Sequence, residues 1–118
     1  MAKFMVVDDS KISRKIIGEL ISELGHSVVI EASSGEEAIE KYDSSIVDCI
    51  LMDIEMGGIS GVEATKILTK KYSDINIIIV CSVCGTLRLK EMQMSGAKGI
   101  VQKPATVSSL ASAISKVL

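Results

Sequence analysis

Aromatic residues are almost missing from this chain of 118 residues, which has one phenylalanine, two tyrosines and no tryptophan. Proteins that hold bases or sugars by stacking need such side chains, so this kind of binding is not favoured. Histidine is equally scarce, and His26 has no second histidine with which to form a metal-ligand cluster. We therefore expect His26 to be a surface turn residue.

An excess of charge of one sign is also missing, because 13 lysine and arginine residues nearly balance 15 aspartate and glutamate residues. The chain thus lacks the basic surface by which proteins bind the nucleic acid backbone. No apolar run reaches the ~20 residues that a membrane span requires, and Asp8 and Asp9 come too early for a signal peptide. We expect a cytoplasmic protein that binds neither nucleic acid directly nor membranes.

Cysteine is limited to Cys49, Cys81 and Cys84, all on or beside apolar segments. An odd number in such places suits reduced intracellular thiols better than a disulfide framework. Cys81 and Cys84 form a C-x-x-C pair, for which a redox pair or half a metal site is the alternative. No second pair exists, and Cys81 ends a β-prone run instead of opening a helix, so we do not expect a functional disulfide.

What the chain does have is a hydrophobic content of 47%, enough for one compact domain over residues 1–118. Short apolar runs predict strands, and the capped or amphipathic segments between them predict helices. This alternation predicts an α/β fold with right-handed crossovers and a parallel sheet covered on both faces. The expected strands are residues 4–7, 27–32, 49–53, 76–81 and 99–102.

Helix starts are marked by hydroxyl side chains that can act as N-caps. Ser10 and Thr106 precede two of the expected helices, and the Ser34–Glu37 and Ser60–Glu63 pairs have the spacing of capping boxes. Helical spacing after Ser10 predicts one apolar face made of Ile12, Ile16, Ile17, Leu20, Ile21 and Leu24.

The segment 85–95 also reads as a helix, but its large apolar residues do not share one clean face. Two interpretations stay open: a shifted core face, or a partner surface rich in adaptable methionine. The residues concerned are Leu87, Leu89, Met92 and Met94.

Polar residues follow four of the expected strands: Asp8 and Asp9, then Asp53, Ser82 and Lys103. The carboxyl ends of parallel strands lie at one edge of a sheet, so these side chains should converge there. Clustered carboxylates repel unless a cation joins them, and oxygen ligands without cysteine or histidine suit Mg²⁺. With a lysine and a hydroxyl nearby, Asp53 becomes a candidate nucleophile for phosphoryl transfer. The plainer alternative is that these residues cap strands and form a salt bridge.

The chain resembles the receiver domain of two-component response regulators and is similar to the single-domain chemotaxis regulators of the CheY type. The resemblance covers the whole chain and rests on five motifs. It implies a flavodoxin-like doubly wound fold, (βα)5, with a five-stranded parallel sheet in the order 2-1-3-4-5. The motifs are VVDDS at 6–10, LMDIEM at 51–56, Cys81-Ser82, Gly96-Ala97 and Lys103-Pro104.

The resemblance implies that Asp53 is the phosphoacceptor for a phosphohistidine on a sensor histidine kinase or phosphotransfer protein. Mg²⁺ would be bound by Asp9, Asp53 and the main-chain carbonyl of Glu55, with Asp8 acting mainly through water. Glu55 and Cys84 would be positions that tune the rate of dephosphorylation.

Further roles follow from the same resemblance. Ser82 would meet the phosphoryl group and move with it, and Lys103 would pair with it. The protein would catalyse only its own phosphorylation and slow dephosphorylation, and would otherwise be no enzyme. Phosphorylation would change the face built from the fourth helix, fifth strand and fifth helix, which would bind a downstream protein target. We expect a monomer or a weak dimer.

Three departures from the family pattern concern coupling to that face. Gly57 replaces the usual proline of the third loop, which should make the loop more mobile. Ile100 lies where an aromatic switch residue is expected, and Ala105 follows Lys-Pro where a larger residue is usual. These departures motivate a second hypothesis, a phosphorylation-independent receiver that acts as an interaction module.

Two more alternatives stay open. The chain ends directly after its last expected helix, which fits either a free-standing messenger or the input domain of a longer regulator. A small redox or flavin-binding α/β protein is motivated by the C-x-x-C pair, although acidic strand ends would repel a flavin phosphate.

Overall fold

The computed structural model describes residues 1–82 and 86–118, in which five strands alternate with five helices. All neighbouring strands pair in parallel, in the order β2-β1-β3-β4-β5, which confirms the flavodoxin-like order expected from the resemblance. The elements are β1 (Lys3–Val7), α1 (Lys11–Glu23), β2 (Ser27–Ala32), α2 (Gly35–Lys41), β3 (Cys49–Asp53), α3 (Gly61–Lys71), β4 (Ile77–Cys81), α4 (Thr86–Met94), β5 (Gly99–Gln102) and α5 (Val107–Val117).

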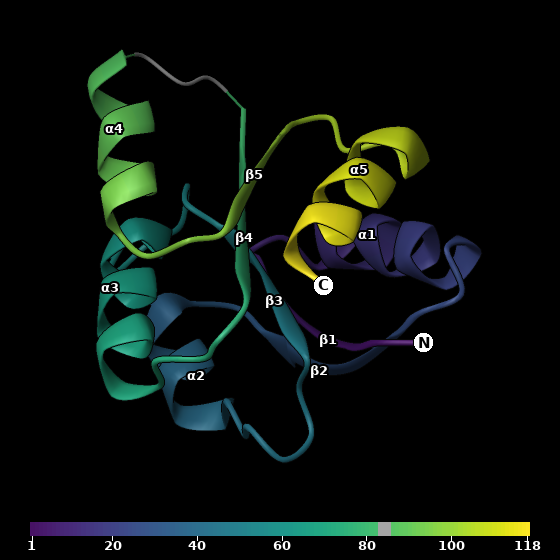
Figure 1. Ribbon diagram of the computed structural model, residues 1–118, viewed down its shortest axis with the longest axis horizontal. Helices are drawn as coiled ribbons and strands as arrows, with labels where there is room; N and C mark the ends of the chain where they lie inside the picture. The colour runs from purple at the N-terminus through teal and green to yellow at the C-terminus, as the bar shows by residue number, and fades with distance from the viewer. Residues whose placement is uncertain (83–85) are drawn as a thin grey trace.

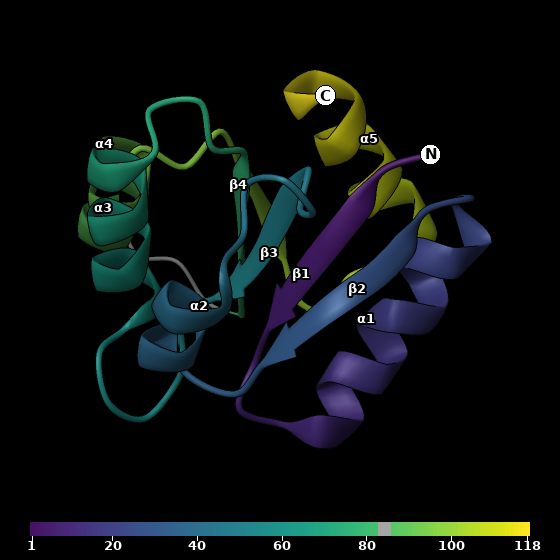
Figure 2. The same cartoon turned by 90° about the horizontal axis from the view of Figure 1, so that it is seen from below.

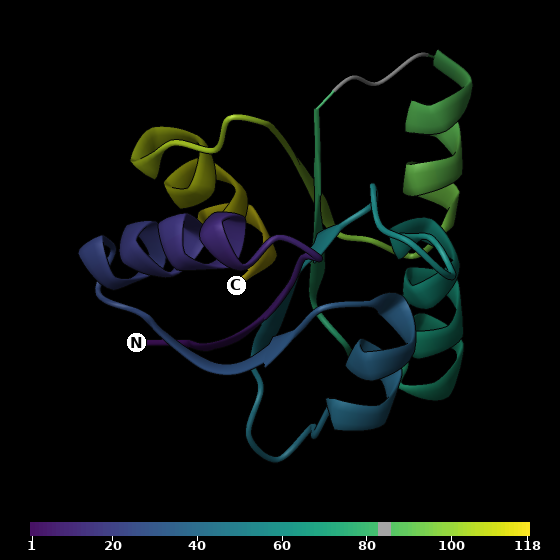
Figure 3. The same cartoon turned by 180° about the vertical axis from the view of Figure 1, so that it is seen from behind.

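The sheet lies between two layers of helices. Helices α1 and α5 cover one face, and α2, α3 and α4 cover the other (Figures 1 and 3). Each face has its own apolar core, because side chains along a strand alternate between the two faces. Phe4 and Leu51 face α1 and α5, whereas Met5 and Ile50 face α2 and α3. The central strand β3 is buried along its whole length, as an uninterrupted apolar run predicts.

The N-caps form where hydroxyl side chains predicted them. Ser10, Ser34, Ser60 and Thr106 each accept a hydrogen bond from the backbone N–H three residues later. The two predicted capping boxes were wrong. The Glu37 carboxylate accepts from the N–H and hydroxyl of Ser33 instead, and at Ser60 only the backbone N–H of Glu63 takes part in the cap. A complete box forms at Thr106 with Ser109, where the sequence had suggested only a cap.

The apolar face predicted for α1 is too wide. Ile17 and Ile21 are buried, but Ile12 is 74% exposed and Ile16 is 52% exposed. A helix turns about 100° per residue, so the nine positions between Ile12 and Ile21 put them on opposite sides of α1. The sheet and α5 cover only the side that carries Ile21, which leaves two isoleucines at the start of the helix in solvent.

Helix α4 buries a single large residue among its described side chains. Met92 packs with Ile54, Val62 and Ile79, whereas Met94 is 75% exposed. The methionines are thus split between core and solvent, as a poorly patterned helix predicts. After the helix, Gly96 has a φ of 100°, a conformation that favours glycine.

The scarcity of histidine had suggested that His26 is only a surface turn residue, but its side chain makes two contacts. Its Nδ1 accepts a hydrogen bond of 2.8 Å from the backbone N–H of Ala2, and its ring lies 5.5 Å from that of Phe4. It therefore ties the start of the chain to the turn after α1. Among the described residues, no helix combines the length and the apolar character that crossing a membrane would need.

Candidate functional site at the carboxyl edge of the sheet

The carboxyl ends of the parallel strands bring the acidic residues together. In Figure 2 the arrowheads of β1 and β2 point to the same edge of the sheet. At this edge, one carboxylate oxygen from each of Asp8, Asp9 and Asp53 lies within 4.8 Å of the other two. Asp8 and Asp53 are buried, and Asp9 is exposed. Such a cluster of oxygen ligands, open on one side, has the donor chemistry that Mg²⁺ prefers.

Asp53 ends β3 and is only 3% exposed. Its Oδ1 lies 3.1 Å from Lys103 Nζ and accepts a 3.1 Å hydrogen bond from the backbone N–H of Glu55. Burial nevertheless raises the pKa of the Asp53 carboxyl, and the neighbouring Asp8 raises it further, while the Glu55 N–H and Lys103 oppose the shift. One lysine does not fully compensate the buried charge, which favours binding of a further cation.

Lys103 reaches the cluster from the end of β5. Its backbone N–H donates to the carbonyl of Cys81, and the peptide bond to Pro104 is cis. Its Nζ lies 3.1 Å from Asp53 and 3.9 Å from Asp8, so the ammonium is closer to Asp53.

Ser82 follows β4, but its hydroxyl is directed to a different carboxylate. Its Oγ donates a 2.5 Å hydrogen bond to Oε1 of Glu55, and this bond is the main cause of a lowered pKa of the Glu55 carboxyl. The carbonyl of Ser82 accepts from Gln102 Nε2 at 3.3 Å. The expected contact of Ser82 with a phosphoryl group therefore stays a prediction, and it would require the bond to Glu55 to break.

Three residues that the sequence pattern did not single out contact Asp8 or Asp53 directly, and one of them is Arg14, whose Nη1 donates to the Asp8 carbonyl. Ser13 donates a 2.5 Å hydrogen bond to Oδ2 of Asp8, and Gly61 lies so close to the Asp53 carbonyl that a Cβ would collide with it. The signal for Gly61 was a glycine at the first position of a helix that follows a loop. Ser13 had no comparable signal, because a serine in a first helical turn is common.

The structure describes two of the three remaining predicted positions, Gly57 and Ile100. At Gly57 a Cβ would meet nothing within 4 Å, so space does not require glycine there. Ile100 is partly buried against the core group that contains Cys81 and Met92. Cys84 lies outside the described residues, so neither its tuning role nor its pairing with Cys81 is described.

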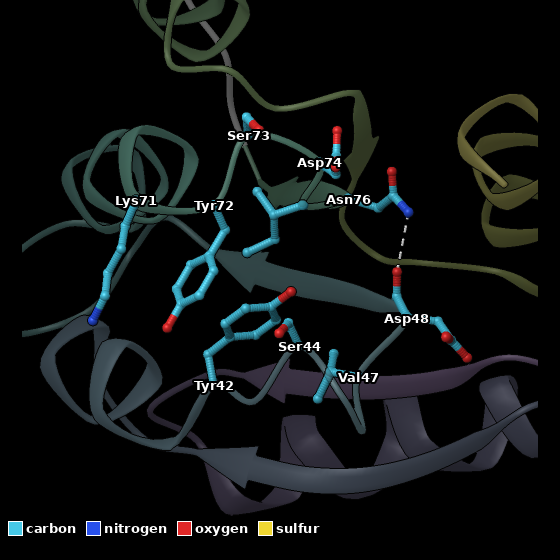
Figure 4. Close-up of a pocket in the computed structure, with 10 residues that line it drawn as sticks. Tyr42, Ser44, Val47, Asp48, Lys71, Tyr72, Ser73, Asp74 and Asn76 are labelled. Atoms are coloured by element: carbon cyan, nitrogen blue, oxygen red, sulfur yellow. Dashed lines mark hydrogen bonds between the residues drawn. The ribbon is translucent and has the colours of Figure 1, made fainter.

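A cleft with a volume of about 470 Å³ lies at the opposite, amino edge of the sheet (Figure 4). Tyr42 and Tyr72 pack edge to face in it, with ring centroids 4.8 Å apart. Asn76 Nδ2 donates to the carbonyl of Asp48, the bond drawn as a dashed line. Asp48 and Asn76 are therefore bonded to each other in this cleft, unlike the crowded carboxylates at the carboxyl edge.

Comparisons with known proteins agree with this geometry. The sequence model of the response regulator receiver domain matches residues 4–115. The chain is 34% identical to chemotaxis protein CheY of Thermotoga maritima, over 98% of this chain and 96% of that protein. It is 33% identical to the response regulator UvrY of Escherichia coli over 99% of this chain, which spans 54% of UvrY.

A solved structure extends the likeness to three dimensions. The response regulator TrrA of Thermotoga maritima, solved in complex with Mg²⁺ and BeF, superposes with a TM-score of 0.86 at 31% identity, and each chain is covered completely. From the family match, the relatives and the strand order together, the chain belongs to the receiver domain family of two-component response regulators and is of the CheY-like type.

Proposed function

We propose that this receiver is a phosphoacceptor switch in which Asp53 takes a phosphoryl group from a phosphohistidine on a sensor kinase or phosphotransfer protein. The observation that carries the proposal is the buried Asp53 carboxylate, 3.1 Å from Lys103 Nζ and clustered with Asp8 and Asp9. A transferring phosphoryl group needs a nucleophile, neutralising cations and little else from the protein.

The acidic cluster fits Mg²⁺, since its carboxylate oxygens lie close together and involve neither cysteine nor histidine. Asp9, Asp53 and the main-chain carbonyl of Glu55 would hold the ion, with Asp8 acting through water. When bound, it supplies positive charge that neutralises the carboxylates and phosphoryl oxygens. The related TrrA was solved with this cation and BeF, which supports the assignment.

The chemical step is a displacement at phosphorus. A carboxylate oxygen of Asp53 forms the new P–O bond as the P–N bond of the phosphohistidine breaks, and the bonding electron pair returns to the imidazole nitrogen. Both contacts that the described residues make with this carboxylate fall on Oδ1. Lys103 would balance the charge on the phosphoryl oxygens.

This protein has an apolar groove beside the site, and we propose that the phosphodonor binds there. A groove of about 480 Å³ runs from the start of α1 to the β5–α5 loop, and its lining combines Ile12, Ile16 and Ala105 with Ser82 and Lys103 of the site. We propose that a protein whose phosphohistidine reaches Asp53 contacts this groove. The solvent-exposed Ile12 and Ile16 would then be covered, which stabilises such a complex.

The output would begin at Ser82. To reach a phosphoryl group on Asp53, its hydroxyl must leave Glu55, and its carbonyl bond to Gln102 links it to β5. We propose that this movement changes the face of α4, β5 and α5, to which Ile100 belongs, and that a protein target binds there.

The experiment is incubation with acetyl phosphate and Mg²⁺, followed by intact mass. Wild-type protein should gain one phosphoryl group, which Asp53→Asn should not. An unchanged mass for wild-type protein would overturn the phosphoacceptor proposal.

That outcome would favour the second candidate, an interaction module that does not need phosphorylation. Ile100 motivates this candidate, because a partly buried isoleucine has neither the size nor the ring of the aromatic residue expected there. The match to about half of UvrY supports a further form of the first candidate, the input domain of a longer regulator.

A further inference from the structure

The first turn of α1 holds Asp8 at three of its atoms. The backbone N–H of Ser10 donates to Oδ1 at 2.9 Å, and the hydroxyl of Ser13 donates to Oδ2 at 2.5 Å. Nη1 of Arg14 donates to the Asp8 carbonyl at 2.6 Å, while its Nε pairs with Glu31 of the neighbouring strand β2. These three bonds fix the positions of the carbonyl and of both carboxylate oxygens of Asp8, and none of them involves Asp9 or Asp53.

The bond from Ser13 falls on the oxygen for which Lys103 competes. Oδ2 of Asp8 lies 3.9 Å from Lys103 Nζ, and Oδ1 of Asp53 lies 3.1 Å from the same atom. Two buried carboxylates thus share one ammonium, and each would bind it more closely if the other were satisfied differently. A hydroxyl donor on Asp8 Oδ2 supplies that alternative partner.

We propose that Ser13 is a positioning residue for the acidic cluster: it holds Asp8 by Oδ2 and thereby leaves Lys103 paired with Asp53. Ser13 acts through Asp8. It also lines the groove proposed for the phosphodonor, so the test uses the small donor acetyl phosphate, which does not need that groove. This inference rests on the proposed function, in which Asp53 is the acceptor and the acidic cluster holds Mg²⁺.

The local structure separates this role from a role in folding. Ser10, not Ser13, is the N-cap of α1, and the cap uses the backbone N–H of Ser13, which alanine keeps. Alanine also has a higher helix propensity than serine. Ser13→Ala therefore removes the hydroxyl that reaches Asp8 and leaves the helix start intact.

The test measures Mg²⁺ affinity by calorimetry, together with thermal unfolding of the metal-free protein and the rate of labelling by acetyl phosphate. Loss of an outer partner of a ligating cluster weakens metal binding about tenfold at the lower end. Ser13→Ala should weaken Mg²⁺ binding by about this factor and slow labelling. Ser13→Thr, which keeps a hydroxyl, should restore both. Ser108→Ala, an exposed serine in the first turn of α5, is the matched control and should change neither.

The outcomes separate the two proposals. Mg²⁺ affinity and labelling of Ser13→Ala that equal those of wild type would overturn the role of Ser13 while leaving Asp53 as acceptor. Weaker Mg²⁺ binding in Ser13→Ala, restored by threonine, would support the positioning role. If wild-type protein were then not labelled by acetyl phosphate, the missing label would overturn only the proposed function. Weaker binding that threonine does not restore would also count against the hydroxyl bond.

Discussion

The two edges of the sheet are built from similar residue types but arrange them in opposite ways. At the amino edge, Oδ2 of Asp48 accepts a 2.8 Å bond from the Lys3 N–H, and Asn76 bonds both Asp48 and Lys98. At the carboxyl edge, Asp8 and Asp53 are buried beside one lysine, and burial raises the pKa of Asp53.

This difference distinguishes an edge at which Asp48 and Asn76 are hydrogen-bonded from one at which buried carboxylates are crowded. Polar groups that satisfy one another gain little from a bound ion, whereas crowded buried carboxylates gain much. The amino-edge cleft of about 470 Å³ and the groove of about 480 Å³ beside the acidic cluster have similar volumes, so volume does not distinguish the two edges. The balance of charge at each edge does.

The largest expected effect comes from comparing one lysine at each edge, Lys103 and Lys98. Lys103→Ala should slow labelling of Asp53 by acetyl phosphate about 100-fold, since loss of one donor to a developing charge has a cost of this order. The amino-edge variant Lys98→Ala, which loses the bond to Asn76, should label within about twofold of wild type. Equal rates for the two variants would remove the functional distinction between the edges.

Close packing at the carboxyl edge predicts the next largest effect. In Gly61→Ala the new Cβ would collide with the carbonyl of Asp53, so we expect a loss of about 2–3 kcal/mol in the free energy of unfolding. Gly57→Ala is the matched control, because its Cβ meets nothing within 4 Å. Urea unfolding measures both, and equal stability of the two variants would contradict the close approach at Gly61.

The charge imbalance predicts an unusual dependence on pH in metal-free protein. The folded state raises the pKa of Asp53, so its contribution favours folding at low pH and is lost as pH rises through the raised value. Asp53→Asn carries no such charge and should melt a few degrees higher than wild type at neutral pH. The difference in melting temperature between Asp53→Asn and wild type should disappear as the pH is lowered. A lower melting temperature for Asp53→Asn at pH 7 would show that Lys103 outweighs burial.

The smallest expected effect belongs to the amino edge. An edge-to-face ring pair contributes about 1 kcal/mol beyond burial, so a double-mutant cycle of Tyr42→Leu and Tyr72→Leu should show coupling of this size. Neither variant should alter labelling of Asp53. A change in labelling would mean that the amino edge communicates with the site.

Short-range signals explain why most of the fold followed from the sequence. Strands such as Cys49–Asp53 are continuous apolar runs, and a hydroxyl before a helix satisfies the same backbone groups in any surroundings. The error at Glu37 arose because Ser33, next to the cap, offered its carboxylate two donors. Burial around α1 was harder to predict, since the position of α5 decides which of its isoleucines are covered.

By itself the sequence determined the alternation of strands and helices and the acidic residues, Ser82 and Lys103 at the carboxyl edge, because these follow from local pattern and from the rule that parallel strands end together. The family and the strand order came from the resemblance that its motifs carry. Only the tertiary structure decided how those residues share their bonds. Lys103 lies nearer Asp53 than Asp8, Ser82 binds Glu55, and Ser13 binds Asp8. Such choices are made among donors from different strands and helices that meet only in the folded chain, so no spacing along the sequence records them.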